Sequence, residues 1–306
     1  LKVLVVGGTR FVGRSLVASL LASGHEVSLF TRGIQPVPSD VDHIKGDRNS
    51  NESLEKLKGR RFEAIVDTSG RKQQDTEKVL SYTGKPLHRF LYVSSAGVYA
   101  DSQELPIDEN YKLDPLSRHS GKAETEDWLI KQNIPFTSFR PTYIYGPGNY
   151  NPIETWFFDR IVNERPIPLP ANCSFLTQLG HVNDLAEAMT KSLSLDVAEN
   201  RIYNCSGDKG VTFLGLAQTA ALACGLDPGQ IDIRYFDQKI LNPKARKSFP
   251  LRIGHFYTDI SRIKNDLDWN PNYNLLSGLL DSFKNDFSNK TNHKPDFSSD
   301  DVLLGK

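Results

Sequence analysis

The sequence predicts an α/β fold, a doubly wound parallel sheet of the Rossmann type with a smaller C-terminal α/β lobe. Three observations lead to this expectation. Strand and helix patterns alternate through the first half of the chain, a glycine turn follows the first strand, and proline-rich irregular segments begin after residue 144. Alternating strands and helices form parallel sheets with right-handed crossovers, and ligands bind at the carboxyl ends of the strands.

The first half of the chain supplies the elements of the sheet. Short apolar runs between turn residues predict strands, and apolar residues at helical spacing predict helices. The expected order is strand 2–6, glycine turn 7–13, helix 14–23, strand 27–30, strand 42–46, helix 50–58, strand 64–66, helix 73–82 and strand 88–95.

The change in composition along the chain predicts three regions. These are a dinucleotide-binding domain over residues 1–150, a smaller substrate or ligand lobe over 151–287 and an extended tail over 288–306. Within the lobe, 176–184 and 202–206 have strand character, and we expect them to return to the first sheet. The tail is polar, which is typical of chain ends that pack weakly.

The turn after the first strand has the composition of a dinucleotide site. A helix N-terminus presents backbone amides to a pyrophosphate, and glycines let the ligand approach the backbone. Many dinucleotide folds of the short-chain dehydrogenase type have Gly-x-x-Gly-x-x-Gly here, whereas this chain has arginine at the middle position. The turn residues expected to contact the cofactor are Gly7, Thr9, Arg10, Phe11, Val12 and Gly13.

The ends of the second and third strands bear on which dinucleotide binds. Thr31 occupies the position where NAD-binding chains place an acid for the ribose 2′-hydroxyl, and Arg32 follows it. An arginine there suits a 2′-phosphate, so the sequence favours NADP over NAD, with Arg10 and Arg32 as phosphate-binding residues. The alternative is that both arginines are solvated. Asp47 is expected to face the adenine or to cap the helix that begins near Ser50.

Residues 93–99, Val-Ser-Ser-Ala-Gly-Val-Tyr, resemble the segment that supplies the active-site serine of extended short-chain dehydrogenases, with Ser95 at the serine position. In those enzymes a Tyr-x-x-x-Lys pair follows, and the lysine lowers the pKa of the tyrosine for proton transfer. Here Lys122 is present, but Arg118 occupies the tyrosine position. Arginine stays protonated and does not act as a general acid or base.

Ser95 and Lys122 are therefore the residual catalytic candidates. Lys122 either hydrogen-bonds a nicotinamide ribose or is an ordinary exposed lysine. Tyr111 and His119 are candidates to replace the missing phenol, although neither has the helical spacing from Lys122 that the tyrosine would have.

The whole chain resembles an extended, atypical short-chain dehydrogenase/reductase and, within that superfamily, the chloroplast stem-loop-binding proteins and their cyanobacterial relatives. The resemblance implies stem-loop RNA binding, metal-assisted endoribonuclease activity and support of ribosomes and transcripts. It also implies a homo- or hetero-oligomer in the cytoplasm of a cyanobacterium or in the plastid stroma. The segments that carry it are 7–13, 29–33, 94–99, 117–126, 140–147, 149–152, 156–158, 178–185 and 300–304.

A basic segment offers support from the residues themselves. Residues 239–252 hold five cations and no acid, and they precede His255, Phe256 and Tyr257. Cations beside aromatic rings suit phosphate contact with base stacking. Extended enzymes of this fold also hold a substrate diphosphate with arginines of the second lobe, and a solvated loop is the third interpretation. The candidates for RNA or diphosphate contact are Lys244, Arg246, Lys247 and Arg252.

Composition sets limits on the function. The chain has 37 Lys and Arg against 37 Asp and Glu, so no net charge attracts nucleic acid to the whole molecule. No apolar run is long enough to span a membrane, and we expect a soluble intracellular protein. Cys173, Cys205 and Cys224 are scattered, which argues against disulfides and a zinc site.

No metal ligands are assigned, because the acidic and histidine side chains near the expected crevice lack ligand spacing. These side chains are Asp108, Glu109, His119, His181 and Asp184. A divalent metal therefore enters only through the nuclease activity that the resemblance implies.

Three functional hypotheses follow. In the leading one, the dinucleotide site is kept, the tyrosine-based chemistry is lost and RNA association is gained. The second is an NADP-dependent epimerase, dehydratase or reductase with a substitute acid/base. The third is a scaffold that binds neither ligand.

Overall fold

The structure is a computed structural model that describes residues 1–171, 174–239 and 241–305. Cys173 lies outside the described residues, as does the side chain of Lys244. The chain forms two compact units. Unit 1 comprises Leu1–Thr142, Val182–Ser206 and Thr258–Asn270, and unit 2 comprises Tyr143–His181, Gly207–Tyr257 and Pro271–Lys306. Each unit is thus assembled from three separate segments. The sequence predicted three consecutive regions, with segments of the lobe returning to the first sheet.

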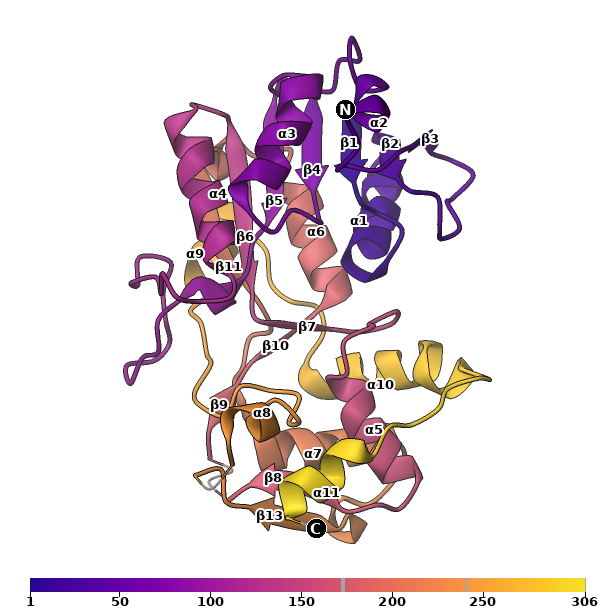
Figure 1. Cartoon of the computed structure of the whole chain (residues 1–306), viewed down its shortest axis with the longest axis vertical. Coiled ribbons are helices and arrows are strands. Elements are labelled where there is room, and N and C mark those ends of the chain that lie inside the picture. The colour runs from indigo at the N-terminus through magenta and orange to yellow at the C-terminus, as the bar shows by residue number, and fades with distance from the viewer. Residues whose placement is uncertain (172–173, 240, 306) are drawn as a thin grey trace. The chain divides into compact units, whose positions relative to one another are not determined.

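Unit 1 is built on a seven-stranded parallel sheet with the strand order β11-β6-β5-β4-β1-β2-β3, drawn in Figure 1. The direction of winding reverses between β1 and β4, which confirms the expected doubly wound fold. The strands are β1 Lys2–Val6, β2 Glu26–Thr31, β3 Asp42–Lys45, β4 Ala64–Asp67, β5 Arg89–Val93, β6 Phe136–Pro141 and β11 Arg201–Cys205.

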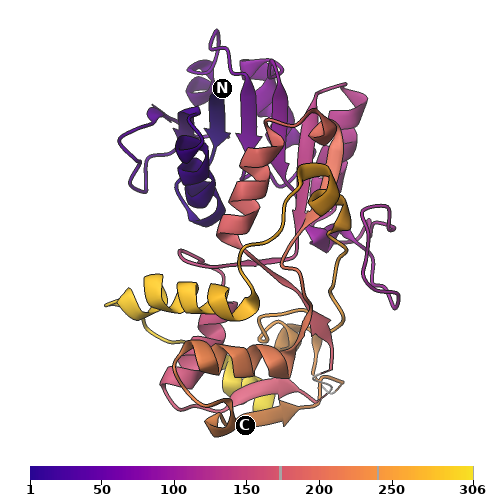
Figure 2. The ribbon, with the colours of Figure 1, turned by 180° about the vertical axis from the view of Figure 1, so that it is seen from behind.

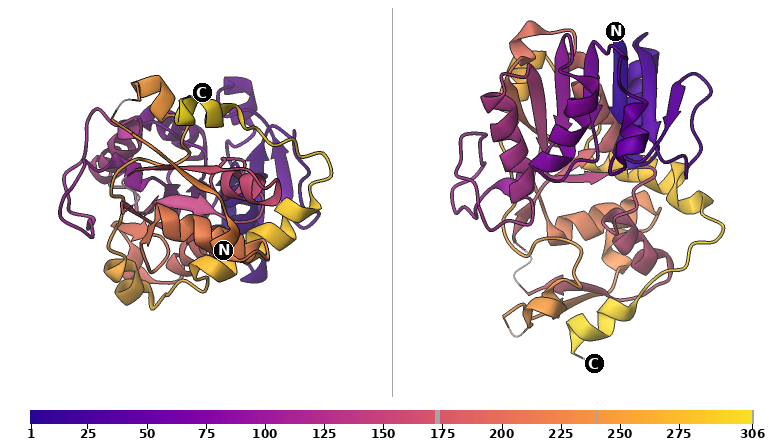
Figure 3. Two further views of the ribbon diagram at one scale, coloured as in Figure 1. Left: turned by 90° about the horizontal axis from the view of Figure 1, so that it is seen from below. Right: turned by 45° about the horizontal axis from the view of Figure 1, so that its top comes forward.

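Helices cover both faces of this sheet, because its central strands are apolar on both sides. Leu54 of α2, Val79 of α3 and Leu129 of α4 share one buried cluster with Leu4 and Tyr92 of the sheet. Figure 1 shows this face, and the tilted view in Figure 3 shows the strands side by side behind α3 and α4. The helices are α2 Asn51–Glu55, α3 Gln73–Thr83 and α4 Ser120–Lys131.

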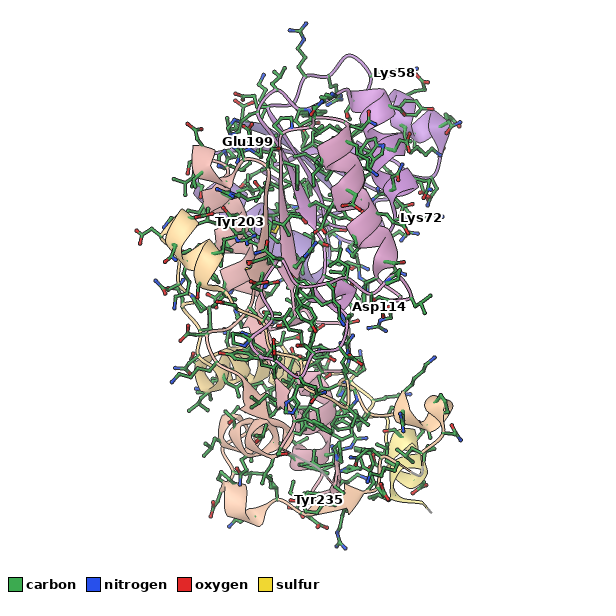
Figure 4. All side chains as sticks on the ribbon, turned by 90° about the vertical axis from the view of Figure 1, so that its left-hand side faces the viewer. Lys58, Lys72, Asp114, Glu199, Tyr203 and Tyr235 are labelled. Carbon is green, nitrogen blue, oxygen red and sulfur yellow. The ribbon has the colours of Figure 1, made fainter. Side chains whose placement is uncertain are left out.

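The opposite face is covered by α1 Phe11–Ala22 and α6 Val182–Ser192, which lie in front of the sheet in Figure 2. Ser19 of α1 donates a hydrogen bond to Thr190 of α6 at 2.8 Å. At the sheet edge, α9 Ser261–Leu267 packs against β11. There Tyr203 donates to Asp266 at 3.0 Å, and Figure 4 shows the Tyr203 side chain on this edge.

Unit 2 is a small α/β unit with an aromatic core. Its core centres on Trp156, Phe157 and Phe158 of α5, which pack with Phe213 and Phe249. Its strand pairs are β7 Tyr143–Tyr145 with β10 Leu179–His181, β8 Ile167–Pro170 with β13 Ile233–Phe236, and β9 Leu176–Thr177 with β12 Val211–Thr212. Its α-helices are α5 Glu154–Val162, α7 Phe213–Ala223, α8 Pro243–Arg246, α10 Leu275–Asn285 and α11 Ser298–Leu304.

Two segments differ from the sequence-based expectation. Residues 202–205 join the sheet within β11, but 176–181 do not, because β9 and β10 take their hydrogen bonds from β12 and β7 inside unit 2. The polar tail is not extended throughout, because it ends in α11. There Asp300 is buried against Arg160, and Leu303 enters the core of unit 2.

Short 3-10 helices complete the secondary structure, and η1 is the one that bears on the site. They are η1 Ala96–Val98, η2 Asp196–Ala198, η3 Pro228–Gln230 and η4 Phe287–Asn289. Across the described residues, every helix is too short or too polar to cross a lipid bilayer.

Candidate functional site

The glycine turn lies between β1 and α1 at the carboxyl edge of the sheet. Gly7 and Gly8 have φ angles of +104° and +99°, which side-chain-bearing residues rarely adopt. A Cβ atom on Gly7 would lie 2.3 Å from Thr68 Oγ1, and one on Gly8 would lie 2.8 Å from Leu29 Cδ2. The turn therefore packs so closely against its neighbours that larger residues would displace them.

Gly13 closes the turn from the helix side. Its amide donates to the carbonyl of Arg10 at 2.9 Å, and a Cβ atom on Gly13 would lie 2.5 Å from Gly8 Cα. Because this contact joins backbone to backbone, the first turn of α1 rests directly on the glycine turn. The first turn contains no acidic residue, so the positive end of the helix dipole faces the sheet edge without a neutralising carboxylate of its own.

The other turn residues surround this cradle. Arg10 is exposed and extended at the N-cap of α1, and Phe11 is buried with a φ of +36°. Thr9 and Val12 are half-buried. A close glycine backbone at a helix N-terminus fits the pyrophosphate of a dinucleotide, and Arg10 places a cation at its rim.

The ends of β2 and β3 form the next part of the edge. Thr31 is the buried last residue of β2, and its hydroxyl lies 3.0 Å from His43 Nε2 of β3. Arg32 follows and is exposed. Asp47 is half-buried, and its carboxylate accepts the Asn49 amide at 2.9 Å.

The expected capping role of Asp47 is wrong. Ser50 is the N-cap of α2, and its hydroxyl accepts the amide of Ser53 at 3.2 Å. Asp47 lies too early in the chain to reach that amide, because its carboxylate closes a turn of its own. The adenine-facing role of Asp47 remains a prediction.

A nearly buried ion pair joins the loop after β3 to the end of β4. Arg48 donates to both carboxylate oxygens of Asp67, at 2.8 and 2.9 Å, and also to Ser69 Oγ at 2.6 Å. Asp67 accepts the Gly70 amide and the Thr76 hydroxyl as well. Burial alone would raise the pKa of Asp67, but Arg48 and the backbone amides lower it. The sequence does not reveal this pair, since it joins Arg48 of the loop after β3 to Asp67, the last residue of β4.

Ser95 lies at the end of β5, where the chain turns into η1. Its hydroxyl accepts the amide of Gly97 at 3.0 Å and thereby caps η1. The side chain is half-buried. The serine predicted from the sequence thus lies at the carboxyl edge of the sheet, where a ligand of this fold class binds.

Lys122 is half-buried in the first turn of α4. Its ammonium donates to the carbonyls of Val93 at 2.5 Å and Gly70 at 3.3 Å, and it lies 5.3 Å from the ring centroid of Tyr92. Burial lowers the pKa of Lys122 to about 8, although Asp67 and Glu126 act in the opposite direction. Lys122 is therefore not an ordinary exposed lysine, because it holds the ends of β4 and β5 to α4.

Arg118 and His119 immediately precede α4. Arg118 Nε donates to His119 Nε2 at 3.0 Å, so that ring nitrogen carries a lone pair and not a proton. A Cβ atom on Gly97 would lie 3.1 Å from both His119 Nε2 and Ser95 Oγ. The imidazole nitrogen and the serine hydroxyl are therefore no more than about 6 Å apart.

The position of His119 is not evident from helical spacing. His119 is the N-cap of α4, outside the regular helix, and Ser117 fixes the preceding loop by donating to the carbonyl of Gly97 at 2.6 Å. The loop carries the imidazole over Gly97 and toward Ser95. The sequence shows only that a histidine precedes a helix. The direction of its side chain depends on the conformation of the loop.

A buried network anchors α4 to the sheet. Arg140 of β6 pairs with Glu126 of α4 at 2.6 Å, and Ser138 donates to the same carboxylate. Arg140 also donates to the phenol of Tyr99 at 3.1 Å. Burial raises the pKa of Tyr99 to about 12 despite this cation, so its phenol stays protonated near neutral pH. Tyr99 therefore does not supply the missing phenolate.

The remaining sequence candidates hold structural contacts. Glu109 pairs with Arg262 at 3.3 Å and accepts the Asn204 amide, all within unit 1. His181 of unit 2 lies 3.2 Å from Asp281 and stacks on Tyr273. Within the described ranges, no three His, Cys, Asp or Glu side chains form a group that could hold a metal ion.

The basic segment lies in unit 2. Arg246 and Lys247 are exposed, and Arg246 Nε donates to the carbonyl of Gln238 at 3.2 Å. Arg252 is half-buried, and its guanidinium lies 4.9 Å from the ring centroid of Phe256. The structure thus places one predicted cation on an aromatic ring and leaves two in solvent.

A glycine turn at the carboxyl edge of a doubly wound sheet, with Ser95 and Lys122 at the same edge, is typical of a class of nucleotide-dependent short-chain proteins. Comparison with known families agrees, because the model of the NAD dependent epimerase/dehydratase family matches residues 3–206. The chain belongs to this family.

Within the family, the chain is 41% identical to the chloroplast stem-loop binding protein of 41 kDa b from Arabidopsis thaliana, over 100% of this chain and 84% of that protein. The resemblance to that protein family inferred from the sequence motifs is confirmed.

Solved structures confirm the fold. UDP-glucose 4-epimerase from Thermus thermophilus, in complex with NAD, has a TM-score of 0.76 and 20% identity, covering 95% of this chain and 100% of that chain. dTDP-glucose 4,6-dehydratase from Bacillus anthracis str. Ames, also in complex with NAD, has a TM-score of 0.75 and 20% identity, covering 95% and 97%. At these identities the likeness concerns the fold alone.

Proposed function

We propose that this chain is an RNA-binding protein on a dinucleotide-binding fold that has lost the tyrosine-based chemistry of its family. Support comes from the 41% identical relative, which is named a stem-loop binding protein. Further support comes from the site itself. Its glycine turn keeps the first and last glycines of the motif, with Arg10 at the middle position, whereas Arg118 replaces the proton-transfer tyrosine.

Arg118 at the tyrosine position is the observation that carries this proposal. Its guanidinium stays charged and donates to His119, so it does not exchange a proton with a substrate. Lys122, whose role would be to lower the pKa of a tyrosine, is bonded to the carbonyls of Gly70 and Val93. The pair that moves protons in related enzymes is therefore absent as a functional unit.

The dinucleotide is proposed to bind as a stable ligand at the glycine turn, with NADP favoured over NAD. Its pyrophosphate would lie on the start of α1, and Arg10 and Arg32 would contact the 2′-phosphate. Lys122 and Asp47 would contact the nicotinamide ribose and the adenine. When bound, the cofactor supplies hydride-transfer chemistry, but this chain has Arg118 at the position of the proton-transfer tyrosine.

RNA is proposed to bind unit 2 through the basic segment. Arg246 and Lys247 offer exposed charges for phosphates, and Arg252 on Phe256 offers a flat surface for a base. Lys244 belongs to the same segment. The proposal also includes association with ribosomal particles, endoribonuclease activity and oligomer formation. It places the protein in the plastid stroma or in a cyanobacterial cytoplasm.

Filter binding of a stem-loop RNA at increasing salt concentration tests the RNA-binding part of the proposal. We expect the logarithm of the affinity to fall linearly with the logarithm of the salt concentration, because bound cations release counterions. Combined replacement of Lys244, Arg246 and Lys247 by alanine should lower both the affinity and the slope. The matched control removes three other exposed charges, Lys58, Arg60 and Arg61. Equal losses in the two variants, or an affinity that ignores salt, would contradict the proposal.

A second function is favoured by one observation, the imidazole of His119 within about 6 Å of the Ser95 hydroxyl. In this alternative the chain is an NADP-dependent epimerase, dehydratase or reductase, and His119 replaces the tyrosine as the acid/base. Purified protein should then convert a sugar nucleotide with cofactor turnover, and His119→Gln and Lys122→Ala should each abolish it. Turnover that survives His119→Gln would exclude this role.

The third possibility, a scaffold without ligands, is separated by thermal unfolding. Ligands that bind the folded state raise the unfolding temperature. NADP, NAD and a stem-loop RNA should each be titrated, and a scaffold would respond to none of them.

A further inference from the structure

We propose that strand β3 completes a pocket for the 2′-phosphate of NADP, in which Lys45 and the Thr31–His43 pair select this cofactor over NAD. The inference rests on the proposed dinucleotide function and adds His43 and Lys45, which the sequence motifs do not single out. It concerns the adenosine end of the site, next to the glycine turn.

The strand register places these residues together. In β1 and β2, Val6 lies opposite Phe30, and the Gly7 amide donates to the Phe30 carbonyl at 3.1 Å. Thr31 in turn lies opposite Lys45 of β3. Gly7, Thr31 and Lys45 are therefore level at the carboxyl edge of three adjacent strands.

The side chains share the face of the sheet that carries α1. Paired residues of parallel strands point to the same face, and residues two apart on one strand do so too. Leu29 pairs with His43 and contacts the Gly8 position beneath the glycine turn. Thr31, His43 and Lys45 therefore belong to the same face as the glycine turn.

Contacts around Gly33 show how closely the side chains lie. A Cβ atom on Gly33 would lie 3.2 Å from Lys45 Cε and 3.3 Å from His43 Cε1. Gly33 has a φ of +71°, so the turn that follows Arg32 folds back over these two side chains. The hydroxyl of Thr31 lies 3.0 Å from His43 Nε2. The Lys45 side chain and the His43 imidazole thus lie against Gly33, the residue after Arg32, and the Thr31 hydroxyl contacts the imidazole.

The charges in this corner favour an anion. Lys45 and Arg32 are both exposed cations. The acid of β3, Asp42, lies at the other end of the strand, where it pairs with Arg60 at 2.6 Å and accepts from Ser28. Asp47 is occupied by the Asn49 amide. A phosphomonoester on the ribose would therefore meet cations and a hydroxyl, whereas an unphosphorylated ribose would meet no carboxylate partner at Thr31.

Calorimetric titration with NADP⁺ and NAD⁺ tests the pocket directly through binding. Charge-assisted hydrogen bonds to phosphate are the strong ones, so we expect NADP⁺ to bind at least tenfold more tightly than NAD⁺. Lys45→Gln and His43→Gln should each weaken NADP⁺ about fivefold to tenfold and leave NAD⁺ unchanged. Thr31→Asp should reverse the preference. Lys58→Gln, at a lysine labelled in Figure 4, is the control that removes an exposed charge elsewhere in unit 1.

The outcomes separate this inference from the proposed function. Equal binding of NADP⁺ and NAD⁺, or a preference unchanged in both β3 variants, would overturn the pocket while the dinucleotide site stands. No binding of either dinucleotide would overturn both. Adenosine 2′-monophosphate, adenosine 5′-monophosphate and a single-stranded RNA distinguish the sources of phosphate. The pocket requires the 2′-monophosphate to compete with NADP⁺ best, and better competition by the RNA would contradict it.

Discussion

At the residue scale, buried or half-buried charged side chains at the candidate site carry structural roles. Lys122 holds two strand ends through carbonyl contacts, and Asp67 holds Arg48 in a nearly buried pair. Both charges lie at the carboxyl edge of the sheet. Their protonation therefore affects the stability of unit 1 as well as any ligand.

The lowered pKa of Lys122 predicts a specific pH dependence. Its pKa falls from 10.5 to about 8 on folding, so between these values the unfolded chain binds more protons and stability rises with pH. Relative to Lys122→Met, the free energy of unfolding of the parent protein should increase by roughly 3 kcal/mol at most from pH 7 to 10.5. Urea unfolding at several pH values measures this. Lys131→Met, at an exposed position, should give no such trend.

The Arg48–Asp67 pair predicts a large cost for one neutral substitution. Asp67→Asn leaves a mostly buried guanidinium without its counter-charge, and we expect unfolding to become easier by about 3 to 5 kcal/mol. Asp42→Asn removes the acid from an exposed arginine pair and should cost about 1 kcal/mol or less. Similar losses of stability in both variants would show that the Arg48–Asp67 pair contributes no more than an exposed pair.

At the element scale, the glycine turn and α1 are in direct backbone contact. Gly13→Ala would press a methyl group against Gly8 Cα, a backbone atom that has no rotamer to adjust. We expect a loss of about 1 to 3 kcal/mol in stability, typical of overpacking, together with loss of the thermal shift by NADP. Gly254→Ala is the control, since its Cβ atom would meet no atom of the described residues within 4 Å. An unchanged NADP response in Gly13→Ala would separate the turn from the ligand.

The elements also show what the sequence can and cannot predict. Buried apolar runs such as 3–6 and 64–66 predict strands well, because both faces of a parallel sheet exclude water. The glycine turn is equally predictable from the sequence, since its φ angles require glycine. The position of His119 and the Thr31–His43 contact cannot be predicted from the sequence. Each depends on a loop or a strand register that brings distant residues together. The return of β11 to the sheet was expected, but the pairing of β10 with β7 was not.

At the scale of the whole molecule, the two proposed ligands belong to different units. The glycine turn and the ends of β2 and β3 lie in unit 1, and the basic segment lies in unit 2. Hydrogen exchange should therefore show protection of residues 7–14 and 31–47 by NADP and of residues 239–257 by a stem-loop RNA. Mass spectrometry of peptides reports both in one experiment. Protection of the same peptides by both ligands would contradict two separate sites.

The alternating assembly of the units has a consequence for synthesis of the protein. The chain passes from one unit to the other five times, and β11, the edge strand of the sheet, is made only after residue 200. Until then β6 has an unpaired edge, and unpaired strand edges promote aggregation of nascent chains. α9 follows later still, so unit 1 cannot finish folding on the ribosome before most of unit 2 has been translated.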